Sequence, residues 1–237
     1  MREPVVPPSP VQDRRPPRRW PVLVLLVAIP VTSVLVLGGL ALQMSGWQAF
    51  RMPSGSMLPG LLQDDFFFVD RTAYADGRQP RRGDIVVYRV PESAGPLARW
   101  NGRPIEFVNR VVGLPGERIE MRNGMPVIDG QPVVRTRVGD FNAYPGFPGH
   151  AAARLRETFA DGTAFEVIKY SRKRPADEGG PATVPAGSFF VMGDNRDDSL
   201  DSRAGWWFVP AENLIGRPNY VYWSGFERIG RMGLTVK

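Results

Sequence analysis

The stretch Asn123-Gly124-Met125-Pro126-Val127-Ile128-Asp129-Gly130 contains two hairpin signals around one short apolar run. Asn-Gly and Asp-Gly pairs favour the positive backbone φ angles of tight two-residue turns, which join antiparallel strands. Residues 125–128 between them have the length and composition of a short strand. This stretch therefore predicts consecutive antiparallel strands joined by tight turns.

The same short-strand pattern recurs on both sides of this stretch. Runs of β-branched and aromatic residues bounded by glycine and proline are typical of strands, and they cover residues 66–69, 84–88, 107–112 and 188–192. Helix signals after residue 60 are weak, and the best covers residues 151–159. The pattern predicts a mostly β domain of coiled antiparallel sheets, barrel-like in form.

Residues 135–185 differ from the rest because they are rich in glycine, proline and charge. We expect an insertion or lid with long loops at about these positions. The chain has no cysteine, so an exported domain would be stabilised by its core alone. A basic, proline-rich tail over the first 20 residues contributes +3 of the net charge of +6, and nothing in the remainder indicates nucleic-acid binding.

The N-terminal part predicts a membrane anchor. No charged residue occurs between Arg19 and Arg51, and residues 22–44 are apolar over the roughly 20 residues that a bilayer requires. Four arginines between residues 14 and 19 precede this segment and only Arg51 lies close after it, so the positive-inside rule places the N-terminus in the cytoplasm and the rest outside. We expect a disordered tail at 1–20, one transmembrane helix at 21–45 and an exported domain at 46–237. A cleaved secretory signal is the alternative, since Gly39-Leu40-Ala41 offers a small-x-small site.

A candidate nucleophile follows directly after this segment. In Pro53-Ser54-Gly55-Ser56-Met57-Leu58-Pro59, glycine and two prolines hold Ser56 on a constrained, non-helical backbone. Ser54 supplies a second hydroxyl two residues earlier. An ordinary turn has the same composition, so other parts of the chain must decide between the two interpretations.

Three further blocks follow in the sequence. They are Arg-Gly-Asp-Ile-Val-Val-Tyr at 82–88, Asn-Arg-Val-Val-Gly-Leu-Pro-Gly-Glu at 109–117, and Gly-Asp-Asn-Arg-Asp-Asp-Ser-Leu-Asp-Ser-Arg at 193–203. The last block has the alternating aspartates of a calcium loop. Its two arginines would compete for the same carboxylates, so an Asp/Arg network that stiffens the loop fits better.

Taken in order, the four blocks resemble those of the type I signal peptidases, membrane-anchored serine proteases that remove signal peptides from exported proteins. The resemblance runs from residue 20 to the C-terminus. It implies a β-rich periplasmic domain with a serine–lysine dyad beside the bacterial cytoplasmic membrane, and no metal or cofactor. The implied partners are the lipid bilayer and the signal peptides of preproteins, cleaved after small residues of the Ala-x-Ala type. Exposed aromatic residues are expected near the site, from Trp206, Trp207, Phe208, Trp223 and Phe226.

The resemblance assigns roles residue by residue. Ser56 corresponds to the nucleophile, and Ser54 to the hydroxyl that stabilises the oxyanion together with the Ser56 N–H. Ser199 corresponds to the serine that orients the general base. A supporting network is implied for Asp194, Arg196, Asp201 and Arg203.

The chain departs from the family at one position. The family's general base is a lysine before the Arg-x-Val-Gly-Leu-Pro-Gly turn, and Asn109 stands there. An amide has no useful basicity. We expect Asn109 to lie within hydrogen-bonding range of Ser56 Oγ. Lys169 is the alternative lysine, and the only histidine, His150, lies in the predicted insertion.

Three functions therefore stay open. The first is a signal peptidase I-like serine endopeptidase that uses Ser56. The second is a catalytically silent, membrane-tethered homologue that binds signal peptides or other partners, because the base is replaced by Asn109. The third is a specialised maturation peptidase for conjugation or pilus assembly.

Overall fold

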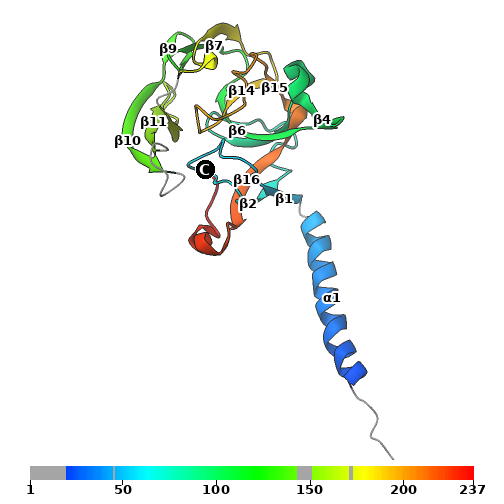
Figure 1. The fold of residues 1–237 in the computed structure, drawn as a ribbon. Coiled ribbons are helices and arrows are strands. Elements are labelled where there is room, and N and C mark those ends of the chain that lie inside the picture. The colour runs from blue at the N-terminus through cyan, green and yellow to red at the C-terminus, as the bar shows by residue number, and fades with distance from the viewer. Residues whose placement is uncertain (1–19, 45, 143–150, 171–172) are drawn as a thin grey trace, which may run out of the picture. The chain divides into compact units, whose positions relative to one another are not determined.

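The computed structural model describes residues 20–44, 46–142, 151–170 and 173–237 (Figure 1). It divides into two compact units, residues 1–44 and 45–237. Most of the predicted tail, residues 1–19, lies outside the described residues, as does His150. The predicted domain boundaries stay predictions.

The first unit contains helix α1, Trp20–Met44, at the position predicted for the anchor. It carries no charged residue and includes Pro30. The Thr32 hydroxyl donates a hydrogen bond to the Ala28 carbonyl one turn earlier, as hydroxyls in helices do. No helix within the described residues satisfies both the length and the hydropathy that crossing a membrane requires. The membrane anchor stays a prediction.

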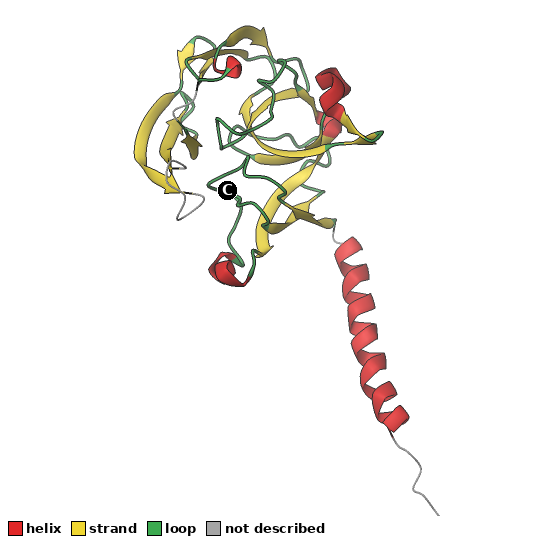
Figure 2. Ribbon diagram, viewed as in Figure 1, coloured by secondary structure: helices red, strands yellow, loops and turns green. Residues whose placement is uncertain are grey.

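The second unit is dominated by strands (Figure 2). The strands are β1 Trp47–Arg51, β2 Phe66–Asp70, β3 Ile85–Arg89, β4 Arg99–Trp100, β5 Arg103–Pro104, β6 Glu106–Gly113, β7 Arg118–Arg122, β8 Met125–Ile128, β9 Gln131–Pro132, β10 Val134–Asn142, β11 Ala151–Thr158, β12 Ala164–Lys169, β13 Gly179–Thr183, β14 Ser188–Met192, β15 Val209–Pro210 and β16 Leu214–Trp223. Short 3-10 helices connect or follow them: η1 Glu92–Ala98, η2 Pro175–Asp177, η3 Ala211–Asn213 and η4 Phe226–Arg231.

The strands form antiparallel sheets, which confirms the mostly β prediction. The largest described sheet has the order β1-β2-β16-β3-β6-β14-β15. A second sheet has the order β13-β7-β8-β9, a third β10-β11-β12, and β4 pairs with β5. Within the large sheet, Val86 on β3 lies opposite Asn109 on β6. This register brings two of the sequence blocks side by side.

The hairpin turns around β8 form as predicted. Asn123 and Gly124 have φ angles of 51° and 72°, and Asp129 and Gly130 have 49° and 80°. All four are positive, as a two-residue turn of this kind requires. β7, β8 and β9 therefore follow one another as neighbours in one sheet.

The central strands bury side chains on both faces. On β3, Val86 and Tyr88 pack into one core cluster, while Ile85 and Val87 pack into another. β14 alternates in the same way, since Phe189 and Val191 face one cluster and its remaining apolar residues another. A strand that is buried on both sides reads as a continuous apolar run, which is why these strands were recognisable in the sequence.

Two expectations about residues 135–185 are wrong. Residues 151–159 were expected to favour a helix, but they form β11. In place of long loops, the described part of the region contains the sheet β10-β11-β12. β11 pairs with a strand on each side, and these hydrogen bonds outweigh the helix propensity of its alanines, leucine, arginines and glutamate.

Candidate active site

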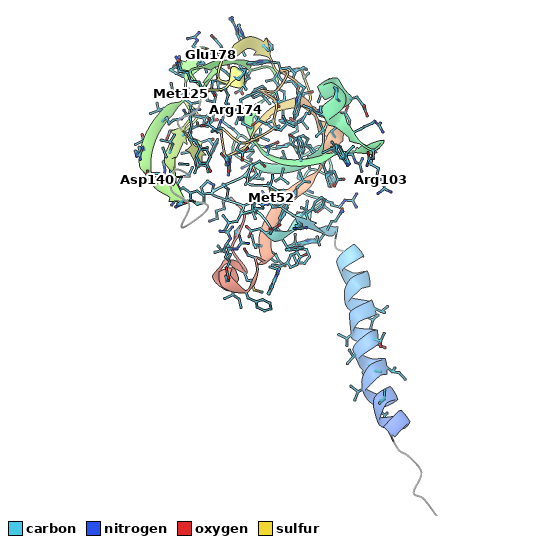
Figure 3. All side chains as sticks on the ribbon, in the orientation of Figure 1. Met52, Arg103, Met125, Asp140, Arg174 and Glu178 are labelled. Atoms are coloured by element: carbon cyan, nitrogen blue, oxygen red, sulfur yellow. The ribbon has the colours of Figure 1, made fainter. Side chains whose placement is uncertain are left out.

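The segment that carries Ser56 connects β1 to β2 and is fixed by its apolar residues. Met52 begins it, and Met57 and Leu61 are fully or almost fully buried against the face of β3 that carries Val87 (Figure 3, where Met52 is labelled). The Met52 N–H donates to the Asp65 carbonyl at 2.8 Å, which closes the segment at its base. Ser56 is half-buried between these anchors. The segment therefore presents one hydroxyl on a rigid support.

The two hydroxyls of the segment lie together. Ser54 Oγ donates to Ser56 Oγ at 3.3 Å, and the Ser56 N–H points at Ser54 Oγ at 3.5 Å. A hydroxyl and a backbone N–H are the donors that stabilise the oxyanion of a tetrahedral intermediate. Their proximity is what the sequence assignment requires of Ser54 and Ser56.

Asn109 is buried, with 1% of its surface exposed, and both of its amide atoms have partners. The Tyr88 hydroxyl donates to Asn109 Oδ1 at 2.6 Å. Asn109 Nδ2 donates to Ser199 Oγ at 3.3 Å. Position 109 therefore contacts Ser199.

The expected hydrogen bond between Asn109 and Ser56 is not found among the described residues. The amide of Asn109 is instead used by Tyr88 and Ser199. Burial raises the pKa of Tyr88 well above its usual value, and the charge of Asp201 raises it further. The phenol is thus protonated at neutral pH and acts as a donor to Asn109.

Gly193 is where the Ser56 segment meets Ser199. A Cβ atom added to Gly193 would overlap the Ser199 side chain and would lie 2.7 Å from the Ser56 carbonyl oxygen. Only glycine leaves room for both groups. Ser199 thus lies next to Gly193, which is close to the Ser56 carbonyl, and also contacts Asn109.

Asp201 and Arg203 form a buried, bidentate ion pair. Arg203 Nε and Nη2 lie 2.8 Å and 2.7 Å from the two carboxylate oxygens of Asp201. Asp201 Oδ2 also accepts the Gly193 N–H at 2.9 Å. Burial raises the pKa of Asp201, but the charge of Arg203 and the hydrogen bonds from Arg203, Gly193 and Ser199 outweigh it and lower the pKa. This carboxylate is therefore ionised and holds Gly193 in place.

Asp194 and Arg196 form ion pairs with residues outside their own block. Arg110 Nε and Nη2 donate to the two oxygens of Asp194 at 2.7 Å and 2.6 Å. Arg196 Nη2 lies 2.5 Å from Glu157 Oε2, and both side chains are buried. Burial lowers the pKa of Arg196 to about 10. The ion pairs thus tie the block to β6 and to β11.

Lys169 is placed in a different cluster. Its ammonium lies 2.5 Å from Asp197 Oδ1 and 3.4 Å from Asp177 Oδ2. Three aspartates of the 193–203 block therefore have cationic partners: Asp194, Asp197 and Asp201. This agrees with the Asp/Arg network rather than a calcium loop. Within the described part of the chain, no group of three or more acidic, histidine or cysteine side chains could hold a metal ion.

Sequence reasoning missed several residues of the site. Tyr88 closes the 82–88 block and Asn195 lies inside the 193–203 block, so membership of a block was the available signal for both. Arg110 directly follows Asn109. Glu157 gave no such signal, because it lies in the segment expected to be helical.

Of the aromatic residues expected near the site, Phe226 is 83% exposed whereas Trp207 is 3% exposed.

The chain is similar to known proteins over most of its length. The family model described as "Signal peptidase, peptidase S26" matches residues 22–223. Signal peptidase I of Leptolyngbya laminosa is 32% identical over 231 residues, which cover 97% of this chain and 93% of that protein. Signal peptidase I of Rickettsia typhi is 30% identical over 203 residues, with 75% and 72% covered. A crystal structure of a signal peptidase I from Enterococcus faecalis is 25% identical and matches 59% of this chain and 97% of its own, with a TM-score of 0.31.

Proposed function

Because this chain belongs to the signal peptidase family, peptidase S26, we propose that it removes signal peptides from exported preproteins as a serine endopeptidase, with Ser56 as its nucleophile. The observation that carries the residue assignment is the contact of Asn109 with Ser199 at 3.3 Å. These two positions are 90 residues apart in the sequence, and their contact supports the proposed pairing of a base position with the serine that orients it.

The reaction would be an acyl transfer. Ser56 Oγ attacks the carbonyl carbon of the scissile bond and forms a tetrahedral intermediate. Ser54 O–H and the Ser56 N–H donate to its oxyanion. The intermediate then collapses to an acyl-enzyme: the C–N bond breaks, and the mature part of the preprotein leaves as an amine that has gained the proton lost by Ser56 Oγ. Water hydrolyses the acyl-enzyme and releases the other part.

Proton transfer is the step for which this chain lacks the family's residue. Asn109 donates through Nδ2 and accepts through Oδ1, but it does not take up a proton at neutral pH. Serine proteases retain about 10³–10⁴-fold catalysis over water after loss of a triad residue. We therefore propose slow cleavage by the chain as given, supported by its oxyanion donors and its bound substrate.

We place the chain in a bacterial cytoplasmic membrane with its N-terminus in the cytoplasm. The apolar, uncharged α1 supports an anchor, and the family match begins at residue 22, inside this helix. The exposed Phe226 is in edge-to-face contact with Trp223. Such aromatic residues suit a membrane interface, so this surface would lie close to the bilayer in which signal peptides reside.

The test is cleavage of a model preprotein, with an Ala-x-Ala site, in liposomes by three proteins. These are the chain as given, Ser56→Ala and Asn109→Lys. We expect slow cleavage by the first, none by Ser56→Ala, and faster cleavage by Asn109→Lys because an amine at this position can accept the Ser56 proton.

Each alternative function has its own outcome. If none of the three proteins cleaves but all bind the signal peptide, the chain is a tethered binding protein. If cleavage requires a pilin-type or conjugation-type precursor and not a general preprotein, it is a specialised maturation peptidase. If Ser56→Ala cleaves as well as the parent protein, the nucleophile assignment is wrong.

A further inference from the structure

Asn195 holds the nucleophile segment at two consecutive carbonyl groups. Its side-chain Nδ2 donates to the Gly55 carbonyl at 3.0 Å. Its backbone N–H donates to the Ser56 carbonyl at 3.0 Å. Asn195 is buried, with 1% of its surface exposed. These two bonds fix the peptide units on both sides of Ser56.

The bond to Gly55 also fixes the direction of the Ser56 N–H. The Gly55 carbonyl and the Ser56 N–H belong to the same peptide unit, which is planar. This unit is trans, since the cis bonds of the described chain are Leu58-Pro59 and Gly180-Pro181. In a trans unit the N–H points opposite to the C=O. When Asn195 holds the carbonyl on one side, the N–H must point to the other, where Ser54 Oγ lies at 3.5 Å.

Asn195 can act as a fixed reference because its own backbone is held by a strand. Ile168 on β12 forms a parallel bridge with Asn195. The Ile168 N–H donates to the Asp194 carbonyl at 2.9 Å, and the Ile168 carbonyl accepts the Arg196 N–H at 2.9 Å. β12 thus holds Asn195 from the side opposite to the nucleophile.

The side-chain oxygen of Asn195 indicates that stability alone does not explain this residue. Asn195 Oδ1 is buried, and no hydrogen-bond partner for it exists among the described residues. A buried acceptor without a partner costs stability. Among the described residues, the side-chain amide of Asn195 thus makes its hydrogen bond through Nδ2, to the Gly55 carbonyl.

We propose that Asn195 is a positioning residue for the oxyanion site: by holding the Gly55 carbonyl, it aims the Ser56 N–H at the oxyanion that forms on the substrate. The proposal rests on the proposed function, because it takes Ser56 as the nucleophile. It concerns an interaction of the tetrahedral intermediate and not of the bound substrate, so Asn195 acts on kcat and leaves KM unchanged.

The experiment compares Asn195→Asp and Asn195→Ala, each made in the full chain and in Asn109→Lys. Asn195→Asp keeps the size of the side chain and removes the donor, while Asn195→Ala removes the donor without adding charge. The matched control is Asn213→Asp, since Asn213 Nδ2 also donates to a backbone carbonyl, that of Arg89, at 2.9 Å on an exposed surface. Four quantities are measured in liposomes: kcat and KM for a model preprotein, the Kd of a peptidyl boronic acid ending in alanine, and the Kd of an uncleavable signal peptide.

Loss of an entire oxyanion donor typically lowers the rate about 10²–10³-fold, so a misdirected donor should lower kcat about 10-fold or more. The boronic acid forms a tetrahedral adduct, so its affinity should fall by a similar factor in both Asn195 variants. KM, binding of the uncleavable peptide and the Asn213→Asp control should stay unchanged.

A fall in kcat together with a rise in KM and weaker binding of the uncleavable peptide would overturn the proposal, because it would indicate general disruption of the fold. Unchanged kcat and boronic acid affinity in both variants would overturn it as well, while leaving the proposed function intact. If the parent protein and Asn109→Lys neither cleave the preprotein nor bind the boronic acid, the proposed function fails together with this inference.

Discussion

Replacing Tyr88 by phenylalanine tests the hydrogen bond that holds Asn109. The substitution removes one hydroxyl and keeps the ring, which packs against Phe107 and Trp207. Both partners are buried, Tyr88 with 0% and Asn109 with 1% of its surface exposed. The change therefore leaves Asn109 Oδ1 without a donor and without access to water, which costs about 1–3 kcal/mol.

The assay is urea unfolding of the full chain in detergent, followed by a double-mutant cycle with Asn109→Leu. Asn109→Leu alone leaves the Tyr88 hydroxyl unpaired and should destabilise by a similar amount. Replacing both partners by apolar groups can be nearly neutral. The double variant should therefore be about 1–3 kcal/mol more stable than the sum of the two single losses predicts.

Tyr74 provides a matched control for this cycle. Its hydroxyl is buried and has no hydrogen-bond partner among the described residues. Tyr74→Phe should therefore be neutral or slightly stabilising, because it removes an unpaired polar group. Equal losses in Tyr74→Phe and Tyr88→Phe, or simple additivity of Tyr88→Phe and Asn109→Leu, would refute the reasoning.

Two further predictions concern the groups around Ser199. Asp201→Asn leaves Arg203 buried without its partner and should cost about 3–5 kcal/mol at pH 7. Since the pKa of Asp201 is lowered in the folded chain, this contribution is fully present above the ordinary value of about 3.9 and is lost as the pH falls through the folded pKa. The free energies of unfolding of the parent chain and of Asp201→Asn should therefore approach each other as the pH falls below this value. A difference that stays constant down to pH 3 would contradict an ionised Asp201 paired with Arg203. Gly193→Ala would press a Cβ onto Ser199 and the Ser56 carbonyl. It should lower the stability by about 1–3 kcal/mol through overpacking and abolish most of the cleavage activity. In the control Gly230→Ala the new Cβ meets no atom within 4 Å, so stability and cleavage should both stay unchanged.

The strands could be predicted because their signals are local. β8 spans Met125–Ile128, the residues predicted, and β14 spans Ser188–Met192, again as predicted. Turn residues mark the ends of β8, and a continuous apolar run marks β14. The first signal depends on short-range sterics and the second on burial. Such signals survive without knowledge of the partner strands.

β11 could not be predicted in the same way, because its conformation depends on its neighbours. Its residues include good helix formers, and the alternation of half-buried Leu155 and buried Glu157 with exposed Arg154 and Arg156 is the weaker signal. Arg154 and Arg156 both pair with Glu166 on β12. Cross-strand pairs of this kind stabilise the strand conformation of β11 only when β12 lies next to it.

In the candidate site, too, the residues with local sequence signals could be predicted, whereas the contacts that depend on strand pairing could not. The sequence blocks predicted roles for Ser56, Asn109 and Ser199, and Asn109 contacts Ser199 in the structure. The partner of Asn109 was not predictable, because Tyr88 reaches it only through the pairing of β3 with β6. Asp194 and Arg196 were expected to support the site, but the identity of their partners depends on β6 and β11.

Both amide atoms of Asn109 have hydrogen-bond partners, and a lysine at position 109 would lose part of these interactions. An ammonium offers three donors and no acceptor, so the Tyr88 hydroxyl would lose the acceptor that it has at 2.6 Å. A neutral amine would accept this hydroxyl proton, but with the lone pair that Ser56 needs. Tyr88 therefore opposes the charged form of such a lysine and competes with Ser56 for the neutral form. Faster cleavage by Asn109→Lys should accordingly be accompanied by lower stability than that of the chain as given, and equal stability of the two proteins would mean that the lysine avoids Tyr88 altogether.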